Sequence, residues 1–155
     1  MKRLLSFLLL TALVFSCGGN SSTTDDAADQ SNAAKPAKVD DGKGVGEIKS
    51  VTLNDPLKPE MVEKGKAIYE MKCSACHKLT GQRVVGPGFL GVTTRRKPEW
   101  IMNMITNVEV MLAEDATAQA LLEECLTRMP NQNLSIGDAR DVVEFFYDND
   151  AKASK

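Results

Sequence analysis

The five-residue segment Cys73-Ser74-Ala75-Cys76-His77 constrains the possible fold and chemistry of this chain more than any other part of its sequence. Two cysteines separated by two residues and followed at once by histidine form the pattern of covalent c-type haem attachment. One helical turn separates the two sulfurs, so both can reach the two vinyl groups of one porphyrin, and the next imidazole can bind the iron. The segment predicts one covalent haem c, attached through Cys73 and Cys76, with His77 as an iron ligand.

Other chemistries could use some of these residues. A thioredoxin-like thiol pair begins a helix that follows a strand, whereas here a helical pattern over residues 60–72 leads into Cys73. A zinc site could use Cys73, Cys76, His77 and Cys125, but adjacent Cys76 and His77 would be cramped on one ion. A disulfide between Cys73 and Cys76 would leave His77 without a role. Haem attachment gives each of the three residues a function.

The residue counts narrow the choice of a second iron ligand. His77 is the only histidine, so two histidines cannot share the iron. Of the seven methionines, Met129 is the leading candidate, because it lies in a polar, proline-containing segment at 127–133 that can form a loop over the far face of the ring. The alternatives that stay open are Met102, Met104, Met111, Cys125, a lysine or an open position.

The N-terminus has the features of an export signal. A basic start is followed by an apolar run that ends near Phe15 and is too short to span a bilayer. Val14-Phe15-Ser16-Cys17 resembles the lipobox of bacterial lipoproteins, which implies a signal peptide over residues 1–16 and a lipid on Cys17. We therefore expect a membrane-anchored lipoprotein at the cell envelope, on its periplasmic or external side.

The segment 17–55 carries the lipidated cysteine and is otherwise rich in small and polar residues, so we expect a flexible linker. Near its end, four apolar residues could lie as an extended arm on the domain: Val45, Ile48, Val51 and Leu53. The folded domain is expected over residues 56–150, with a tail at 151–155. It is too small for a large multidomain enzyme.

Composition supports a domain built around a cofactor. The chain has only one Trp, two Tyr and five Phe, which is little ring area for a core of roughly 100 residues. The formal charge is −2, and the loss of Lys2 and Arg3 with the signal makes it −4. That balance argues against a nucleic-acid partner.

Helical patterns account for most of the expected domain. Apolar residues recur at helical spacing over 60–72, from Pro98 to about residue 105, over 114–126 and over 139–146. Pro98 suits the first turn of a helix. Ser135 and Asp138 resemble a capping box at the start of the last helix. The expected fold is all-α, with several short helices wrapped around one covalently attached haem, and with Phe145 over Gly65 where the first and last helices meet.

From Met61 to about Asp148 the chain resembles class I, monohaem cytochromes c. The resemblance rests on Gly65 and Tyr69 before the attachment segment, on Gly86-Pro87-Gly88-Phe89-Leu90-Gly91 as the family's Gly-Pro-x-Leu loop, and on Met129-Pro130. It implies an electron carrier in which the Pro87 carbonyl accepts a hydrogen bond from the His77 ring. Leu90 and Val92 would then line the haem, and Trp100 would be either core or a contact to a haem propionate.

A narrower similarity connects residues 46–48, 98–101 and 129–132 with lipoprotein cytochromes associated with nitrous oxide reductase in some Gram-negative bacteria. It implies redox-protein partners, with a terminal reductase among the possible acceptors, and no small-molecule substrate. No catalytic residue is expected, since no distal acid, base or second histidine is evident. The alternatives are a haem enzyme or gas sensor with an open distal site, and a zinc or thiol structural module.

Charge is unevenly distributed along the domain. Residues 71–98 hold six basic residues and no acid, whereas residues 99–150 hold eleven acids against Arg128 and Arg140. A basic rim around the haem could steer an acidic redox partner, or the charges could simply be solvated.

Overall fold

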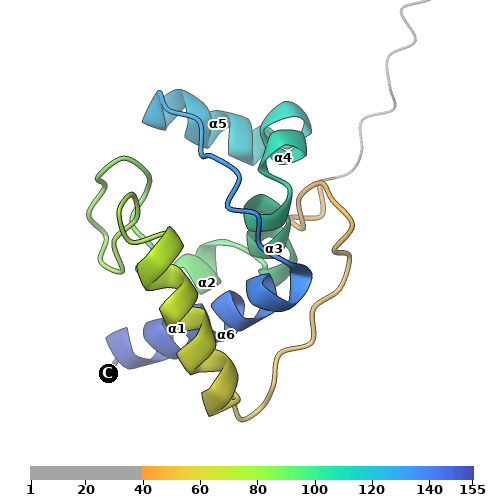
Figure 1. The fold of residues 1–155 in the computed structure, drawn as a ribbon. Helices are drawn as coiled ribbons and strands as arrows, with labels where there is room; N and C mark the ends of the chain where they lie inside the picture. The colour runs from red at the N-terminus through yellow and green to blue at the C-terminus, as the bar shows by residue number, and fades with distance from the viewer. Residues whose placement is uncertain (1–39) are drawn as a thin grey trace, which may run out of the picture. The chain divides into compact units, whose positions relative to one another are not determined.

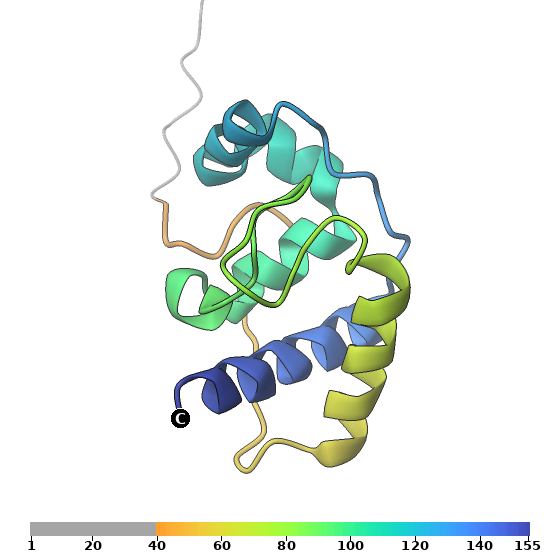
Figure 2. The same ribbon diagram turned by 90° about the vertical axis from the view of Figure 1, so that its left-hand side faces the viewer.

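A computed structural model of the chain describes residues 40–155, and this part contains six α-helices and no β-strand (Figures 1 and 2). The helices are α1 (Pro59–Lys72), α2 (Val92–Arg95), α3 (Pro98–Thr106), α4 (Val108–Glu114), α5 (Ala116–Cys125) and α6 (Ile136–Ala153). The all-α expectation is confirmed. The expected signal peptide, Cys17 and the first part of the linker lie outside the described residues.

Local chemistry explains where several helices begin. Proline opens both α1 and α3, where its fixed φ suits a helix and its missing N–H costs no hydrogen bond. At α6 the Ser135 hydroxyl accepts a hydrogen bond from the Asp138 amide, and the Asp138 carboxylate accepts one from the Ser135 amide. The expected capping box is therefore present.

The crossing of α1 and α6 forms one side of the domain (Figure 2). A Cβ atom on Gly65 would lie 2.1 Å from the Asp141 carbonyl oxygen and 2.8 Å from Phe145 Cβ. Only glycine lets the two backbones approach this closely. Tyr69 then packs on Phe145, with their ring centroids 5.5 Å apart. The expected position of Phe145 over Gly65 is confirmed.

Two short helices were not anticipated from the sequence. One is α2, whose first turn is held to α6 because Asp150 accepts hydrogen bonds from the Gly91 and Thr93 amides at 2.9 and 3.0 Å. The other is α4, which is separated from α3 by Asn107, a residue with non-helical φ and ψ. Together α3, α4 and α5 form the side of the domain that faces α1 and the loop after it (Figure 1).

Residues 40–55 lie on the helices rather than apart from them, running beside α3 and then toward the start of α1 (Figure 1). Ile48 is buried, and Val45, Val51 and Leu53 are partly buried against the core. These are the apolar residues that suggested an extended arm. The sequence had placed this whole segment in the linker.

Within residues 40–155, no helix combines the length and the apolar character needed to cross a bilayer.

Candidate haem-binding site

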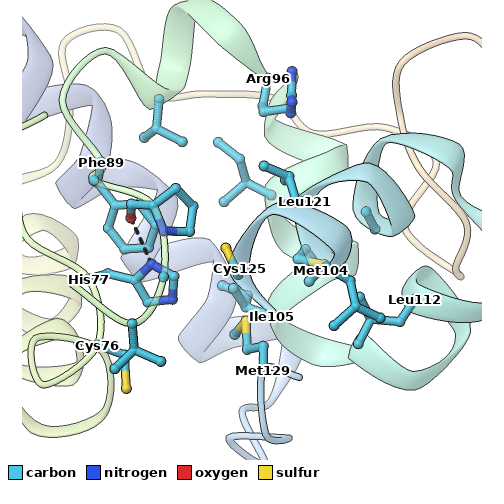
Figure 3. Close-up of a pocket in the computed structure, with 18 of the residues that line it drawn as sticks. Cys76, His77, Phe89, Arg96, Met104, Ile105, Leu112, Leu121, Cys125 and Met129 are labelled. Atoms are coloured by element: carbon cyan, nitrogen blue, oxygen red, sulfur yellow. Dashed lines mark hydrogen bonds between the residues drawn. The ribbon is translucent and has the colours of Figure 1, made fainter. Parts of the chain in front are cut away.

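An apolar cavity of about 230 Å³ lies between the attachment segment and the helices on the other side of the domain. Its walls come from the segment 85–89, from α3, from α5 and from the loop that follows α5 (Figure 3). The apolar residues contributed by α3 and α5 are Trp100, Ile101, Met104, Ile105, Ala118, Leu121 and Leu122. The lining thus provides the dry, largely apolar surroundings that suit a porphyrin.

The attachment segment continues the geometry of α1. The Cys73 amide donates the last helical hydrogen bond to the Tyr69 carbonyl, and the His77 amide donates to the Cys73 carbonyl at 2.9 Å. This turn places Cys76 and His77 in the cavity wall, while Cys73 is buried and is not among the lining residues. Burial raises the pKa of the Cys73 thiol to about 11, although nearby Lys72 acts in the opposite direction. The free thiol is therefore protonated at neutral pH.

The His77 ring has a defined orientation. Its Nδ1 lies 2.9 Å from the Pro87 carbonyl oxygen, the partner that the family resemblance implied. Because a carbonyl can only accept, Nδ1 must carry the proton, and the lone pair is left on Nε2. Burial lowers the pKa of His77, and the Pro87 hydrogen bond opposes this effect. A neutral imidazole with a free Nε2 is the form that binds a metal.

Two neighbouring residues pack directly against this ring. A Cβ atom at Gly86 would lie only 2.2 Å from His77 Cε1, so the ring rests directly on the glycine backbone. Phe89 stacks on the imidazole, with ring centroids 4.5 Å apart and an interplanar angle of 8°. In addition, the Tyr69 hydroxyl donates to the His77 carbonyl at 2.8 Å.

The structure places Phe89, and not Leu90, in the cavity wall. The Leu90 side chain is 44% exposed and does not line the cavity, whereas Phe89 does. The sequence could have identified Phe89, because the apolar residue of Gly-Pro-x-Leu stands two positions after proline. Counted from Pro87, that position is Phe89. Val92, the other expected wall residue, does line the cavity.

Two methionines line the cavity among the described residues, and they are Met104 and Met129. Figure 3 shows both on the side of the cavity away from His77. Met111 is fully buried elsewhere, and its sulfur accepts a hydrogen bond from the Val45 amide at 3.1 Å. Met102 is buried outside the lining. The structure therefore brings Met129 to the site together with His77, with Met104 as the remaining thioether.

Cys125 also lines the cavity, at the end of α5, and is partly exposed. The sequence left Cys125 open as a ligand of the iron or of zinc, and the structure places it in the cavity wall. The zinc alternative finds no support in the geometry. Nowhere in residues 40–155 do three histidine, cysteine or acidic side chains gather closely enough to hold a metal ion.

Trp100 lines the cavity with its ring while its polar atom is already engaged. The indole Nε1 donates to Asp115 at 3.1 Å, and the same carboxylate oxygen accepts the Ala118 amide at the start of α5. The Arg96 guanidinium lies 5.1 Å from the centre of the ring on one face. Trp100, expected to be either core or a contact to a haem propionate, is thus buried in the cavity wall.

Charges that are separated in the sequence are partly paired in the fold. Arg83, from the basic segment, lies 2.7 Å from Glu124, and Arg128 lies 2.7 Å from Glu109. Both pairs are on the surface near the cavity. Arg128 itself lines the cavity, and Arg83 and Glu124 are close in sequence to the lining residues Val85 and Cys125. Only the Arg83 contact pairs a charge of the basic segment, and Arg95 and Arg96 of that segment line the cavity.

The donor set fits haem c. Two thiols stand one turn apart at the end of α1, a neutral imidazole faces the cavity, and a thioether lies on the far wall. Covalent attachment needs the two thiols, and axial ligation needs the imidazole and the thioether.

Comparisons with known proteins agree with this geometry. The family model described as Cytochrome c matches residues 62–147. The solved cytochrome c from Rhodothermus marinus is similar at 30% sequence identity, with a TM-score of 0.67, over 69% of this chain and 91% of that one. An engineered form of that cytochrome is similar at 29% identity, with a TM-score of 0.65, over 68% and 91% of the two chains. No match was found among curated proteins. The chain therefore belongs to the cytochrome c family, and its all-α domain binds one haem c covalently.

Proposed function

We propose that this c-type haem protein is an electron carrier in which His77 and Met129 are the two axial ligands. The observation that carries the proposal is the placement of these two side chains on opposite sides of one apolar cavity. Haem bound there supplies an iron centre that accepts and releases single electrons. A thioether ligand favours the reduced state and so gives a relatively high reduction potential.

The residues of the chain keep the site ready for this reaction without binding a substrate. Pro87 and Phe89 hold the imidazole in one orientation, so little rearrangement accompanies electron transfer. The cavity lining, within the described residues, contains no carboxylate and no histidine besides His77. We therefore propose that the natural protein is not an enzyme. The Rhodothermus marinus cytochrome that was solved with a carbene intermediate is 28% identical to this chain, and it is an engineered protein.

The test is a reversible one-electron titration of the purified protein, followed by exposure of its reduced form to carbon monoxide. A carrier with both axial positions held by the chain gives one reversible transition and an unchanged reduced spectrum when the gas is added. Rapid binding of carbon monoxide would instead favour the gas sensor or enzyme with an open distal site.

We also propose that the protein works at the cell envelope, anchored by a lipid on Cys17, and exchanges electrons with respiratory proteins. The support is the lipobox-like sequence and the similarity to cytochromes associated with nitrous oxide reductase. The acceptor is tested by mixing the reduced protein with that reductase and nitrous oxide. Reoxidation that requires both is expected, and reoxidation at the same slow rate without the reductase would contradict this choice of acceptor.

A further inference from the structure

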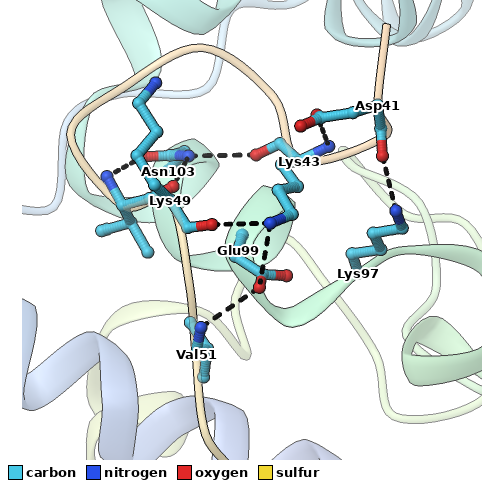
Figure 4. A network of polar contacts seen from close by, with 8 residues as sticks. Asp41, Lys43, Lys49, Val51, Lys97, Glu99 and Asn103 are labelled. Atoms are coloured by element: carbon cyan, nitrogen blue, oxygen red, sulfur yellow. Dashed lines mark hydrogen bonds and ion pairs between the residues drawn. The ribbon is translucent and has the colours of Figure 1, made fainter.

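Residues 40–55, called the arm here, are held to α3 by a buried amide (Figure 4). Asn103 is only 1% exposed. Its Nδ2 donates to the carbonyls of Lys43 and Ile48 at 3.0 and 2.9 Å, and its Oδ1 accepts the Ile48 amide at 3.2 Å. All three hydrogen bonds go to backbone groups of the arm, so they depend on the conformation of its backbone and not on its side chains.

Glu99 makes a second attachment one helical turn earlier. It is also buried, and it accepts the Val51 amide at 3.1 Å. The Lys43 ammonium lies 3.9 Å from the same oxygen and donates to the Lys49 carbonyl at 2.7 Å. The arm therefore follows α3, and side chains of that helix bond to the backbone of Lys43, Ile48 and Val51.

The arm approaches the helices closely at two glycines. A Cβ atom on Gly46 would lie 2.1 Å from Asn103 Oδ1, a distance that no side chain could tolerate. At Gly44 a Cβ atom would lie 2.8 Å from the Met111 sulfur and 3.1 Å from Trp100 Cδ1. The arm therefore lies directly against Trp100, which is itself part of the cavity wall.

Helix α3 presents different faces to the arm and to the cavity. Glu99 and Asn103 are four residues apart and so share one face. Each residue turns the helix by about 100°, so residues one and two positions later point to other sides. The residues of α3 that line the cavity are in these positions, and they are Trp100, Ile101, Met104 and Ile105. A shift of α3 away from the arm would therefore also change the wall of the cavity.

We propose that the arm and Asn103 position α3 against the haem and thereby help to set the reduction potential. This inference rests on the electron-carrier function proposed above. The arm precedes the stretch 62–147 that matches the cytochrome c family. Its release would loosen the apolar wall and admit water. Water stabilises the more highly charged oxidised state, so the potential would fall.

The experiment uses the full-length haem-loaded protein with Gly46→Ala, and with Gly81→Ala as its matched control. A Cβ at Gly81 meets nothing within 4 Å, whereas the one at Gly46 collides with Asn103. The expected result for Gly46→Ala is faster hydrogen exchange at the Ile48 and Val51 amides, by about tenfold or more. A reduction potential below that of the unaltered protein should accompany it, with haem still attached. Gly81→Ala should leave both measurements unchanged.

A second pair of variants covers the case in which Gly46→Ala does not fold. Asn103→Asp keeps the size of the side chain but cannot donate to the Lys43 and Ile48 carbonyls, and Asn107→Asp makes the same change where no side-chain cap bond exists. We expect the first to lower the potential and the second to leave it unchanged. Faster exchange in the arm with an unchanged potential would overturn the proposal, as would unchanged exchange in both Gly46→Ala and Asn103→Asp. A missing reversible couple in the unaltered protein would instead overturn the carrier function.

Discussion

Glu144 shows how a single side chain can join two distant parts of this chain. It is 0% exposed on α6, and its Oε1 accepts hydrogen bonds from the Asn54 amide, at 3.1 Å, and from the Asn54 side chain, at 2.7 Å. Arg140 donates to the same oxygen and also to the Thr52 carbonyl. Burial alone would raise the pKa of Glu144, but these hydrogen bonds outweigh it and hold the pKa below its usual value.

Replacing Glu144 by glutamine should destabilise the protein in a pH-dependent way. The loss of the buried charge is expected to lower the free energy of unfolding by about 3 kcal/mol at pH 7. Because the folded-state pKa is lowered, the carboxylate stabilises the fold above its unfolded pKa of about 4.3, and this stabilisation is lost as pH falls through the folded value. Denaturant unfolding of both proteins between pH 7 and 3 should therefore show a difference that shrinks toward acid.

Exposed Glu123 provides the control for this measurement. Glu123→Gln should change the free energy of unfolding by less than about 0.5 kcal/mol at every pH. A difference between Glu144→Gln and the unaltered protein that stays constant from pH 7 to 3 would contradict a titrating carboxylate at this position.

The residues of the site differ in how far the sequence could identify them. Cys73, Cys76 and His77 lie within five residues of one another, and the spacing of the three residues alone indicates haem attachment. The contact of Pro87 with His77 needed the family resemblance, because no local rule joins residues ten positions apart. The prediction of Leu90 as a wall residue is wrong by one position, because the apolar residue of Gly-Pro-x-Leu, counted from Pro87, is Phe89.

At the scale of helices, the crossing of α1 and α6 depends on the absence of one side chain. Gly65→Ala would place a methyl group against the Asp141 carbonyl and Phe145, so the helices would have to separate. We expect a loss of about 1–3 kcal/mol in the free energy of unfolding, as for other overpacked cores. Thermal or denaturant unfolding of the haem-loaded protein measures this loss.

Gly137→Ala is a matched change in the first turn of α6. Its Cβ would meet only the Ser135 hydroxyl, at 3.6 Å, which is an ordinary contact. Alanine forms helices better than glycine, so a gain of up to about 1 kcal/mol is expected. If both alanine variants destabilised the protein equally, the account of the helix crossing would be wrong.

The helices themselves were predictable where their patterns were long. The first and last helices have strong starts and regular apolar spacing, and both were expected. Helix α4 was not, because its two ends depend on the non-helical backbone of Asn107 and on buried Asp115, which accepts from Trp100 fifteen residues earlier. The hydrogen bonds of the arm are equally long-range, since they join residues 43–54 to α3 and α6. Sequence periodicity reports burial, but it does not report such partners.

At the scale of the whole molecule, the proposed lipid on Cys17 can be separated from the folded domain. The described domain includes residues 40–155 and contains the complete cavity. Cys17→Ser should therefore release a soluble protein that still carries covalent haem, measured by haem staining of membrane and soluble fractions. The unaltered protein should stay with the membrane. Equal membrane retention of both proteins would place the anchor elsewhere.

The identity of the distal ligand tests the carrier account most directly. The oxidised protein should show the weak near-infrared band of sulfur-to-iron charge transfer, and Met129→Leu should abolish it while the haem stays attached through Cys73 and Cys76. Met104→Leu is the matched control, since Met104 is the other methionine that lines the cavity among the described residues, and it should keep the band. Retention of the band in Met129→Leu with its loss in Met104→Leu would move the ligand to α3 and contradict the proposed site.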